Sequence, residues 1–263
     1  MTPLVRVKNL RVSYGEGKRR REVVRNVSFD IPARKILGLV GESGSGKTTV
    51  GRALIRLVSP SAGAFEYAGV SLFDLDEKAF RPYRKRIQMV FQDPYSTLNP
   101  RLSIRTSLKE ALSLSHPDES ETWEDRMAVK MRLVGLEPEH LRRYPHQFSG
   151  GQRQRIGIAR ALCVEPDFLV CDEPVSSLDV SIQAQILNLI RDLQESLGLT
   201  CLFISHDLRV VRHMAREVAV MRAGEIVEFG DADQVFESPT HSYTQGLLRA
   251  IPGRERLVRG FTQ

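Results

Sequence analysis

Polar and hydrophobic side chains alternate over the first part of the chain. Val, Phe and Ile occupy positions 27, 29 and 31, with Ser and Asp between them. A period of two residues is typical of a strand with one face in water. The apolar positions of residues 4–12 predict a neighbouring strand. The N-terminal part of the chain is therefore expected to be rich in β-structure.

A strand, a glycine-rich loop and a helix are predicted next. Residues 35–40 (KILGLV) form a short apolar run, and the stretch GESGSG follows it. Five apolar residues then recur at helical spacing: Val50, Ala53, Leu54, Leu57 and Val58. The dipeptide Ser59-Pro60 comes after them, and because proline cannot continue a helix, the helix is expected to end before it.

The segment from about residue 93 to residue 162 has few strand signals. We expect it to form a helical subdomain. It contains a polar, acidic stretch, HPDESETWED at residues 116–125, which predicts an exposed connection between helices.

Strands and helices alternate after this segment. Residues 168–171 and 200–204 are short apolar runs typical of buried strands. Between them, one face of a predicted helix carries these residues: Ile182, Ile186, Leu189, Leu193 and Leu197. This alternation favours a mostly parallel sheet with covered faces. Residues 217–221 and 225–229 flank Arg222-Ala223-Gly224 and predict a closing hairpin.

The composition allows one large domain or two closely packed ones. The chain has 263 residues, of which 41% are hydrophobic, enough to bury a core without disulfides or metals. Three cysteines lie in apolar runs, which predicts buried thiols in a reducing compartment and argues against a zinc or disulfide framework: Cys163, Cys171 and Cys201. No run approaches the roughly 18 apolar residues that cross a bilayer, so we expect a cytosolic protein unless a partner anchors it.

The net charge of +6 raises the question of an anionic partner. The densest basic run, residues 18–21, lies in a connection that contains glycine, which is more typical of a solvated hairpin turn than of a binding patch. Nucleic-acid binding would favour aromatic residues among the basic ones, and only Tyr14 is nearby. We therefore expect no nucleic-acid partner.

The sharpest motif is GESGSGKT at residues 41–48, between the predicted strand and helix. Glycines allow backbone N–H groups to surround phosphate oxygens, and the helix N-terminus adds a partial positive charge. Lys47 would reach the terminal phosphates, and the Thr48 hydroxyl could bind magnesium. A merely flexible Gly-Ser turn would leave the Lys-Thr pair and the flanking elements unexplained.

Two adjacent carboxylates, Asp172 and Glu173, follow the buried strand at residues 168–171. In phosphate-loop proteins an aspartate at a strand end holds the magnesium shell, and a neighbouring glutamate could polarise the attacking water. The alternative is a helix cap ahead of Pro174. Together with the phosphate loop, the pair predicts a phosphate-loop protein that binds nucleotide and magnesium, and GTPases, small-molecule kinases and motor ATPases all stay open.

A second anion-binding helix start is predicted at Ser149-Gly150-Gly151-Gln152. With this motif the chain resembles the ABC ATPase family, whose signature is Leu-Ser-Gly-Gly-Gln. Phe148 replaces the leucine, which is a mild departure.

The resemblance covers nearly the whole chain and implies further roles. Tyr14 matches the aromatic residue that stacks on adenine, Gln92 the glutamine that reaches magnesium, and His206 the histidine that contacts the terminal phosphate. The run Ser177-Leu178-Asp179 matches the loop that communicates between subunits. Without the resemblance, Tyr14 would be an ordinary strand tyrosine and His206 an unremarkable residue after a strand.

The implied site can be given by role. The catalytic residues are Glu173, His206 and Lys47. The magnesium ligands are Thr48, Gln92 and Asp172. The ATP-binding residues are Tyr14, Gly41, Glu42, Ser43, Gly44, Ser45, Gly46, Lys47, Thr48, Thr49, Gln92, Ser149, Gly150, Gly151, Gln152, Asp172 and Asp179. All of these positions hold the active residue types, which indicates a working ATPase.

The resemblance also implies the fold and the assembly. We expect an α/β phosphate-loop NTPase with a RecA-like core, an N-terminal antiparallel β-subdomain and an inserted helical subdomain. Residues 1–92 and 163–232 would form the core with the β-subdomain, 93–162 the helical subdomain and 233–263 a short extension. Two subunits would meet head to tail, with ATP between the phosphate loop of one and residues 149–152 of the other.

Three runs resemble the peptide and nickel importer ATPases of bacteria: residues 95–101, 174–190 and 239–248. Such importers commonly combine two different ATPase chains, two membrane-spanning permease subunits and an extracytoplasmic binding protein. A heterodimer at the cytoplasmic face of the membrane is therefore implied, and a homodimer stays open. Many relatives continue into a cysteine-containing tail, and no cysteine follows Pro252 in this sequence. Oligopeptides, dipeptides, nickel or metallophores, and peptide antibiotics all stay open as cargo.

Two other classes share part of this pattern. DNA-repair and chromosome-organising ATPases carry long coiled coils or zinc modules between the two motifs, and residues 49–148 show neither heptads nor ligand cysteines. Ribosome-associated ABC factors normally carry two cassettes, whereas this chain has one. The transporter subunit is the interpretation that fits.

Overall fold

The computed structural model describes three stretches of the chain: residues 3–15, 17–93 and 97–250. The chain forms two compact units, one from Met1–Asp74 with Leu202–Gln263 and the other from Leu75–Cys201. Tyr95, in one of the runs that resemble importer ATPases, lies outside the described residues.

The first unit contains an antiparallel sheet in the order β2-β1-β4-β5. Its strands are β1 (Val5–Tyr14), β2 (Arg21–Ile31), β4 (Ala62–Tyr67) and β5 (Val70–Ser71). β1 pairs with β2 so that Val5 lies opposite Ile31. The alternating positions Val27, Phe29 and Ile31 are buried. The predicted pair of strands at the front of the chain is confirmed.

The first unit also holds four strands of a second sheet, in the order β10-β9-β3-β8. They are β3 (Ile36–Val40), β8 (Thr200–Ser205), β9 (Glu217–Arg222) and β10 (Glu225–Asp231). β3 runs parallel to β9, whereas β9 and β10 are antiparallel and are joined through Ala223 and Gly224. The predicted hairpin is confirmed, and the parallel pair agrees with an α/β fold.

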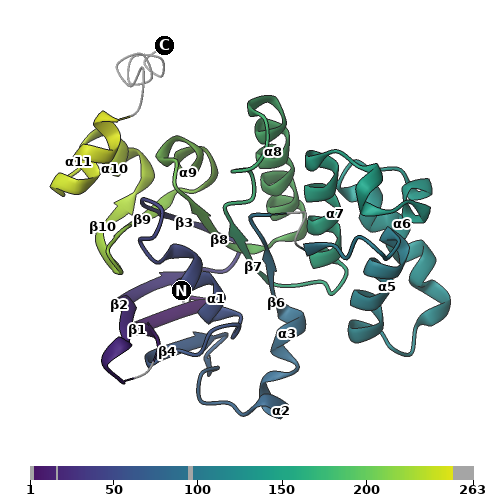
Figure 1. Ribbon diagram of the computed structural model, residues 1–263, viewed down its shortest axis with the longest axis horizontal. Coiled ribbons are helices and arrows are strands. Elements are labelled where there is room, and N and C mark those ends of the chain that lie inside the picture. Colours follow the sequence, from purple (N-terminus) through teal and green to yellow (C-terminus); the bar gives the residue numbers. More distant parts are fainter. Residues whose placement is uncertain (1–2, 16, 94–96, 251–263) are drawn as a thin grey trace. The chain divides into compact units, whose positions relative to one another are not determined.

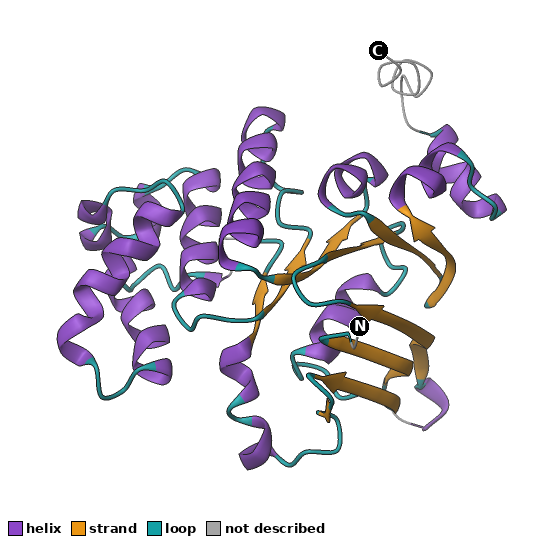
Figure 2. Cartoon of the chain, turned by 180° about the vertical axis from the view of Figure 1, so that it is seen from behind, coloured by secondary structure: helices purple, strands orange, loops and turns teal. Residues whose placement is uncertain are grey.

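Short helices accompany these sheets. They are η1 (Gly17–Arg19), α1 (Lys47–Leu54), α9 (Leu208–Met214), α10 (Ala232–Glu237) and α11 (Ser242–Arg249). Helix α1 lies against β1 and β2 (Figure 2). Helix α9 packs on β3 at Gly38, where an added Cβ would lie 2.1 Å from Cγ1 of Val211. A glycine at this position therefore allows the close approach of helix and strand.

Helix α1 is shorter than the sequence pattern predicts. It ends at Leu54, and Leu57 is 57% exposed rather than part of an apolar helix face. Arg56 has a φ of 55°, a left-handed conformation that ends helices. The N–H of Leu57 donates to the carbonyl of Arg52 at 2.9 Å. The backbone thus turns out of the helix before it reaches the proline.

The second unit has a pair of parallel strands and is otherwise mainly helical. The strands are β6 (Ile87–Val90) and β7 (Phe168–Asp172). The helices are α2 (Glu77–Phe80), α3 (Tyr83–Arg86), α5 (Ile104–Ser115), η2 (Ser120–Thr122), α6 (Trp123–Leu133), η3 (Pro138–Arg142), η4 (Pro145–Gln147), α7 (Gly150–Leu162) and α8 (Val180–Leu197). Helices α5, α6 and α7 lie side by side (Figure 1). The helical character expected for residues 93–162 is confirmed for the described part, whereas β6 was not predicted.

Helix α8 has the predicted extent but a shorter apolar face. Ile186 and Leu193 are buried, whereas Leu197 is 43% exposed. Gly198, with a φ of 65°, is the C-cap of the helix. Leu197 is the last residue of the helix, beside this cap, and its side chain is less covered than the sequence period suggests.

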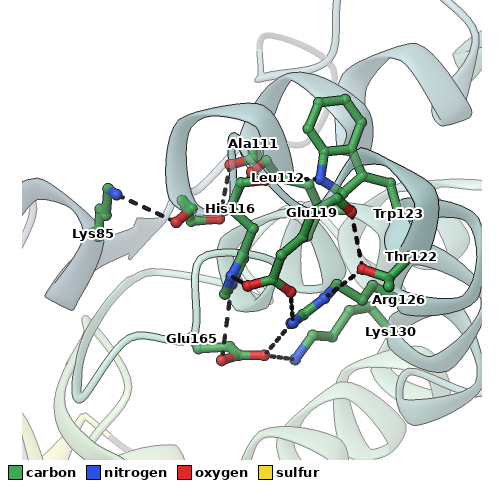
Figure 3. A network of polar contacts seen from close by, with 11 residues as sticks. Lys85, Ala111, Leu112, His116, Glu119, Thr122, Trp123, Arg126, Lys130 and Glu165 are labelled. Atoms are coloured by element: carbon green, nitrogen blue, oxygen red, sulfur yellow. Dashed lines mark hydrogen bonds and ion pairs between the residues drawn. The ribbon is translucent and has the colours of Figure 1, made fainter.

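The acidic stretch at residues 116–125 is more ordered than a plain exposed connection. His116 is half-buried, and its Nδ1 lies 3.3 Å from Oε1 of Glu119 (Figure 3). Arg126 pairs with Glu119 and with Glu165, and Lys130 lies 3.4 Å from the same Glu165 carboxylate. The stretch is mostly exposed, as predicted, but its charges hold the end of α5 to α6 and to the loop after α7.

All three cysteines are buried and free: Cys163, Cys171 and Cys201. Burial raises the pKa of Cys163 and of Cys171 to about 12, and it raises that of Cys201 as well. The prediction of buried thiols is confirmed.

Candidate functional site

The phosphate loop lies in the first unit, between β3 and α1. Gly44 and Gly46 have φ values of 80° and 106°, which residues with a Cβ rarely adopt. An added Cβ at Gly41 would lie 2.1 Å from the carbonyl oxygen of Met221. The N-cap of α1 is Gly46, which makes no side-chain cap. The helix therefore presents a bare N-terminus, which suits an anion.

Lys47 is folded onto this loop. Its side chain is buried, at 3% exposure, and Nζ donates to the carbonyl oxygens of Gly41 at 2.7 Å and Glu42 at 2.8 Å. A hydroxyl contact with Ser45 is longer, at 3.4 Å. Burial makes an ammonium costly without acceptors, so these carbonyls fix its position. A cation held beside an uncapped helix N-terminus fits a polyphosphate ligand.

The carboxylate pair lies in the second unit, at the end of β7. Asp172 is the last residue of the strand and is 2% exposed. Glu173 follows with a φ of 44°, a conformation that is uncommon for a residue other than glycine and is often found at functional sites. The backbone carbonyl of Glu173 accepts from the N–H of Ser176 at 3.2 Å and from its hydroxyl at 3.1 Å.

Gln92 contacts this glutamate. Its Nε2 donates to Oε2 of Glu173 at 3.3 Å. The Ser177 hydroxyl lies 3.5 Å from the carbonyl oxygen of Gln92. Gln92, Glu173 and Ser177 come from separate motifs and lie together in the second unit. Their spacing in the sequence does not indicate the hydrogen bond between the amide and the carboxylate.

The signature segment begins helix α7 with a capping box. The Ser149 hydroxyl accepts from the N–H of Gln152 at 3.3 Å, and Oε1 of Gln152 accepts from the N–H of Ser149 at 3.1 Å. The Ser149 oxygen therefore caps the helix and still has its own proton to donate to an anion.

The two signature glycines also have a packing role that the sequence analysis missed. An added Cβ at Gly151 would lie 2.5 Å from Cγ2 of Ile182, and one at Gly150 would lie 3.2 Å from Cδ2 of Leu178. The start of α7 thus packs closely on the loop and helix that follow the carboxylate pair. No local sequence signal could have shown this long-range contact.

Thr48 and Thr49, in the first turn of α1, are half-buried, and three further predicted site residues are exposed. In the first unit Tyr14 is 43% exposed at the end of β1, and His206 is exposed after β8. In the second unit Asp179 is exposed at the start of α8.

The residue after His206 is held firmly. Asp207 caps α9 by accepting from the N–H of Arg209 at 2.8 Å, and it pairs with the guanidinium of the same arginine at 2.7 Å. Burial alone would raise the pKa of Asp207, but these hydrogen bonds, with a contribution from His206, leave it lowered. The turn that carries His206 is therefore anchored on its C-terminal side.

A phosphate loop between β3 and α1, and a buried strand that ends in a carboxylate pair, define a phosphate-loop NTPase. The family described as ABC transporter matches residues 24–176, and the family described as the C-terminal region of oligopeptide/dipeptide transporters matches residues 227–259. The chain belongs to the ABC transporter family. It is an ATP-binding and ATP-hydrolysing subunit.

Relatives in bacteria are similar over most of their length. The chain is 48% identical over 251 residues to the oligopeptide transport ATP-binding protein OppF of Streptococcus mutans, covering 95% of this chain and 82% of that protein. It is 47% identical over 253 residues to the dipeptide transport ATP-binding protein DppF of Lactococcus lactis, covering 95% and 81%.

Solved structures agree with the fold. CbiO1 of Clostridium perfringens, part of the ABC transporter complex cbiONQ, matches with a TM-score of 0.80 and 25% identity, covering 98% of this chain and 99% of that one. A dimeric ATP-binding cassette in a post-hydrolysis state, bound to ADP and Pi, matches with a TM-score of 0.76 and 27% identity, covering 87% and 98%. The expected fold class is confirmed. Among the described residues, no helix is both long and apolar enough to span a bilayer.

Proposed function

We propose that this chain energises a bacterial importer of dipeptides or oligopeptides. The observation that carries the proposal is the match of residues 227–259 to the C-terminal region of oligopeptide/dipeptide transporters. The OppF and DppF relatives are named for the same cargo. We therefore favour peptides over the nickel chelates that the sequence pattern left open.

The proposed assembly follows the resemblance. The chain would bind two membrane-spanning permease subunits at the cytoplasmic face of the membrane, together with a second ATPase chain, and an extracytoplasmic binding protein would deliver the peptide. The dimeric cassette among the similar structures supports pairing of two ATPase chains. A heterodimer is the form that we propose.

ATP would bind the phosphate loop through its bare helix N-terminus and Lys47. The adenine would stack on Tyr14, which is an exposed residue. Thr48, Gln92 and Asp172 offer a hydroxyl, an amide and a carboxylate, the oxygen donors that suit Mg²⁺. Because Nε2 of Gln92 is the donor to Glu173, Oε1 of the same amide keeps its acceptor role. When bound, Mg²⁺ neutralises charge on the phosphate oxygens.

Hydrolysis would depend on Glu173 as the residue that accepts a proton from water or orients it. The hydrogen bond from Gln92 restrains the direction of this carboxylate. Lys47 and His206 would stabilise the charge that develops on the transferred phosphoryl group. Positioned charge of this kind is the main catalytic device in phosphoryl transfer.

Ser149, Gly150, Gly151 and Gln152 would act on the nucleotide of the partner subunit. The Ser149 hydroxyl accepts inside its own helix, so its proton is available for a phosphate oxygen. Asp179, on the loop after Glu173, would take part in communication with the partner ATPase subunit. ATP hydrolysis would then require two subunits.

We also propose a functional division of the chain. Residues 1–92 and 163–232 would bind and hydrolyse ATP, residues 93–162 would carry the signature to the partner's nucleotide, and residues 233–263 would form a short extension. This division follows from the positions of the motifs.

Recovery of the chain from detergent-solubilised membranes of its host tests the proposal. Two multi-spanning proteins and a second ATPase should stay bound to the wild-type chain, and the peptide-binding protein of the same system can then be screened for cargo. Recovery with ribosomes or DNA-bound proteins, and without membrane subunits, would contradict the transporter assignment.

A further inference from the structure

The C-terminal helix α11 contacts the phosphate loop directly. The backbone N–H of Glu42 donates to the hydroxyl of Tyr243 at 3.1 Å, across 201 positions of the sequence. Glu42 lies in the segment matched by the ABC transporter family, and Tyr243 in the segment matched by the oligopeptide/dipeptide C-terminal region. One hydrogen bond thus joins the loop to the part of the chain that is characteristic of peptide transporters.

The backbone of Tyr243 is fixed by its neighbours. His241 caps α11, and its Nδ1 accepts from the N–H of Tyr243 at 3.1 Å. On β10, the Glu228 carboxylate accepts from the N–H of Thr240 at 2.7 Å and from the N–H of His241 at 3.2 Å. The start of α11 is therefore tied to a strand, which limits how far the tyrosine can move.

The ring of Tyr243 is held as well. The guanidinium of Arg222 lies 5.0 Å from the ring centroid, within the range of a cation–π contact. Arg222 ends β9, and Gly224 in the same hairpin donates its N–H to the carbonyl oxygen of Ser45 at 2.9 Å. The hairpin and α11 together hold the phosphate loop at two points, Glu42 and Ser45.

The hydroxyl of Tyr243 is suited to accept a hydrogen bond. Burial raises the pKa of Tyr243, although the hydrogen bond from Glu42 opposes this. The phenol is therefore neutral near pH 7 and keeps its proton. A neutral hydroxyl accepts from the Glu42 N–H without adding negative charge beside a loop that must bind phosphates.

We propose that Tyr243 is a positioning residue for ATP binding, through which the C-terminal region sets the conformation of the phosphate loop. The inference rests on the proposed role of this loop in binding ATP. A loop already held in its binding conformation loses less conformational freedom when the ligand arrives. Without the hydroxyl, the nucleotide itself would have to order the segment around Glu42.

The variant Tyr243→Phe removes the hydroxyl and keeps the ring against Arg222. Ser242→Ala is the matched control, since it removes an exposed hydroxyl from the preceding position of the same helix. The affinity of the purified chain for a fluorescent ATP analogue should fall about three- to tenfold in Tyr243→Phe, the loss expected for one hydrogen bond. It should stay unchanged in Ser242→Ala.

Hydrogen exchange at the Glu42 amide provides the second measurement. This amide should exchange faster in Tyr243→Phe, while the β3 amides keep their protection. Equal nucleotide affinity and equal Glu42 exchange in Tyr243→Phe and in the wild type would overturn the inference. Failure of the wild-type chain itself to bind the analogue would instead overturn the proposed role of the loop, and the inference with it.

Discussion

Nε2 of Gln92 donates a hydrogen bond to Oε2 of Glu173 at 3.3 Å. Glu173 has left-handed backbone geometry and follows the buried Asp172 directly. The amide therefore restrains the carboxylate at its Oε2 atom, and the left-handed backbone sets the direction in which the side chain leaves the main chain. A restrained carboxylate suits the role that we propose for Glu173, which is to act on the attacking water.

Replacing Glu173 with Gln should stop turnover and spare binding. The variant keeps the shape of the side chain but cannot accept a proton, so the rate of phosphate release should fall at least about 100-fold. ATP affinity should change little, because the role proposed for Glu173 concerns the attacking water and not the nucleotide. Single-turnover hydrolysis and equilibrium nucleotide binding measure the two effects separately. Wild-type turnover in this variant would rule out the role of Glu173.

Ser149 can be tested with two variants that separate its roles. Ser149→Ala loses both the hydroxyl and the helix cap, and should lower stability by about 1 kcal/mol. Ser149→Asn can still cap α7 but lacks the hydroxyl. Both should impair hydrolysis by the assembled pair of subunits while the isolated chain still binds ATP. Loss of ATP binding by the isolated Ser149→Asn chain would contradict action on the partner's nucleotide.

Two glycines of α7 should respond in opposite directions to alanine. Gly151→Ala places a Cβ 2.5 Å from Cγ2 of Ile182 and should destabilise the fold by about 1–3 kcal/mol through overpacking. Gly157→Ala meets no atom within 4 Å and should stabilise the helix by up to about 1 kcal/mol. Denaturant unfolding measures both. Equal effects of the two substitutions on the free energy of unfolding would contradict the expected clash between a Cβ at position 151 and Ile182.

The cysteines should be unreactive in the folded chain. The native protein should resist a thiol reagent at pH 8, whereas the denatured chain should react with three equivalents of the reagent. Because the pKa values of Cys163 and Cys171 are raised from 9.0 to about 12, the burial of neutral thiols favours folding fully below pH 9. This contribution is lost as the pH rises toward 12. Fast labelling of the native chain at pH 8 would contradict the buried assignment.

The sequence predicted those parts of the molecule whose signals are local. The two-residue period around Phe29 and the apolar run before the phosphate loop gave the right strands, because burial of one strand face or of both leaves a pattern in the sequence itself. The phosphate loop was predictable since its glycines, lysine and threonine are adjacent. The ends of helices were less so, as the turn at Arg56 shows.

Contacts between distant residues could not be predicted. Nothing in the spacing shows that Gln92 touches Glu173, that Gly151 makes room for Ile182, or that Tyr243 reaches Glu42. Each of these contacts depends on how separate elements pack, and packing is not encoded in any short window of residues.

ATP hydrolysis by the complete transporter tests the central claim most directly. The wild-type chain, purified with the permease subunits and the second ATPase that we propose for it, should hydrolyse ATP faster when the proposed binding protein carries a peptide than when it is empty. The same complex with Glu173→Gln should show no such stimulation. Equal hydrolysis with and without peptide, in a complex that contains all its subunits, would contradict the account of this chain as the ATPase of a peptide importer.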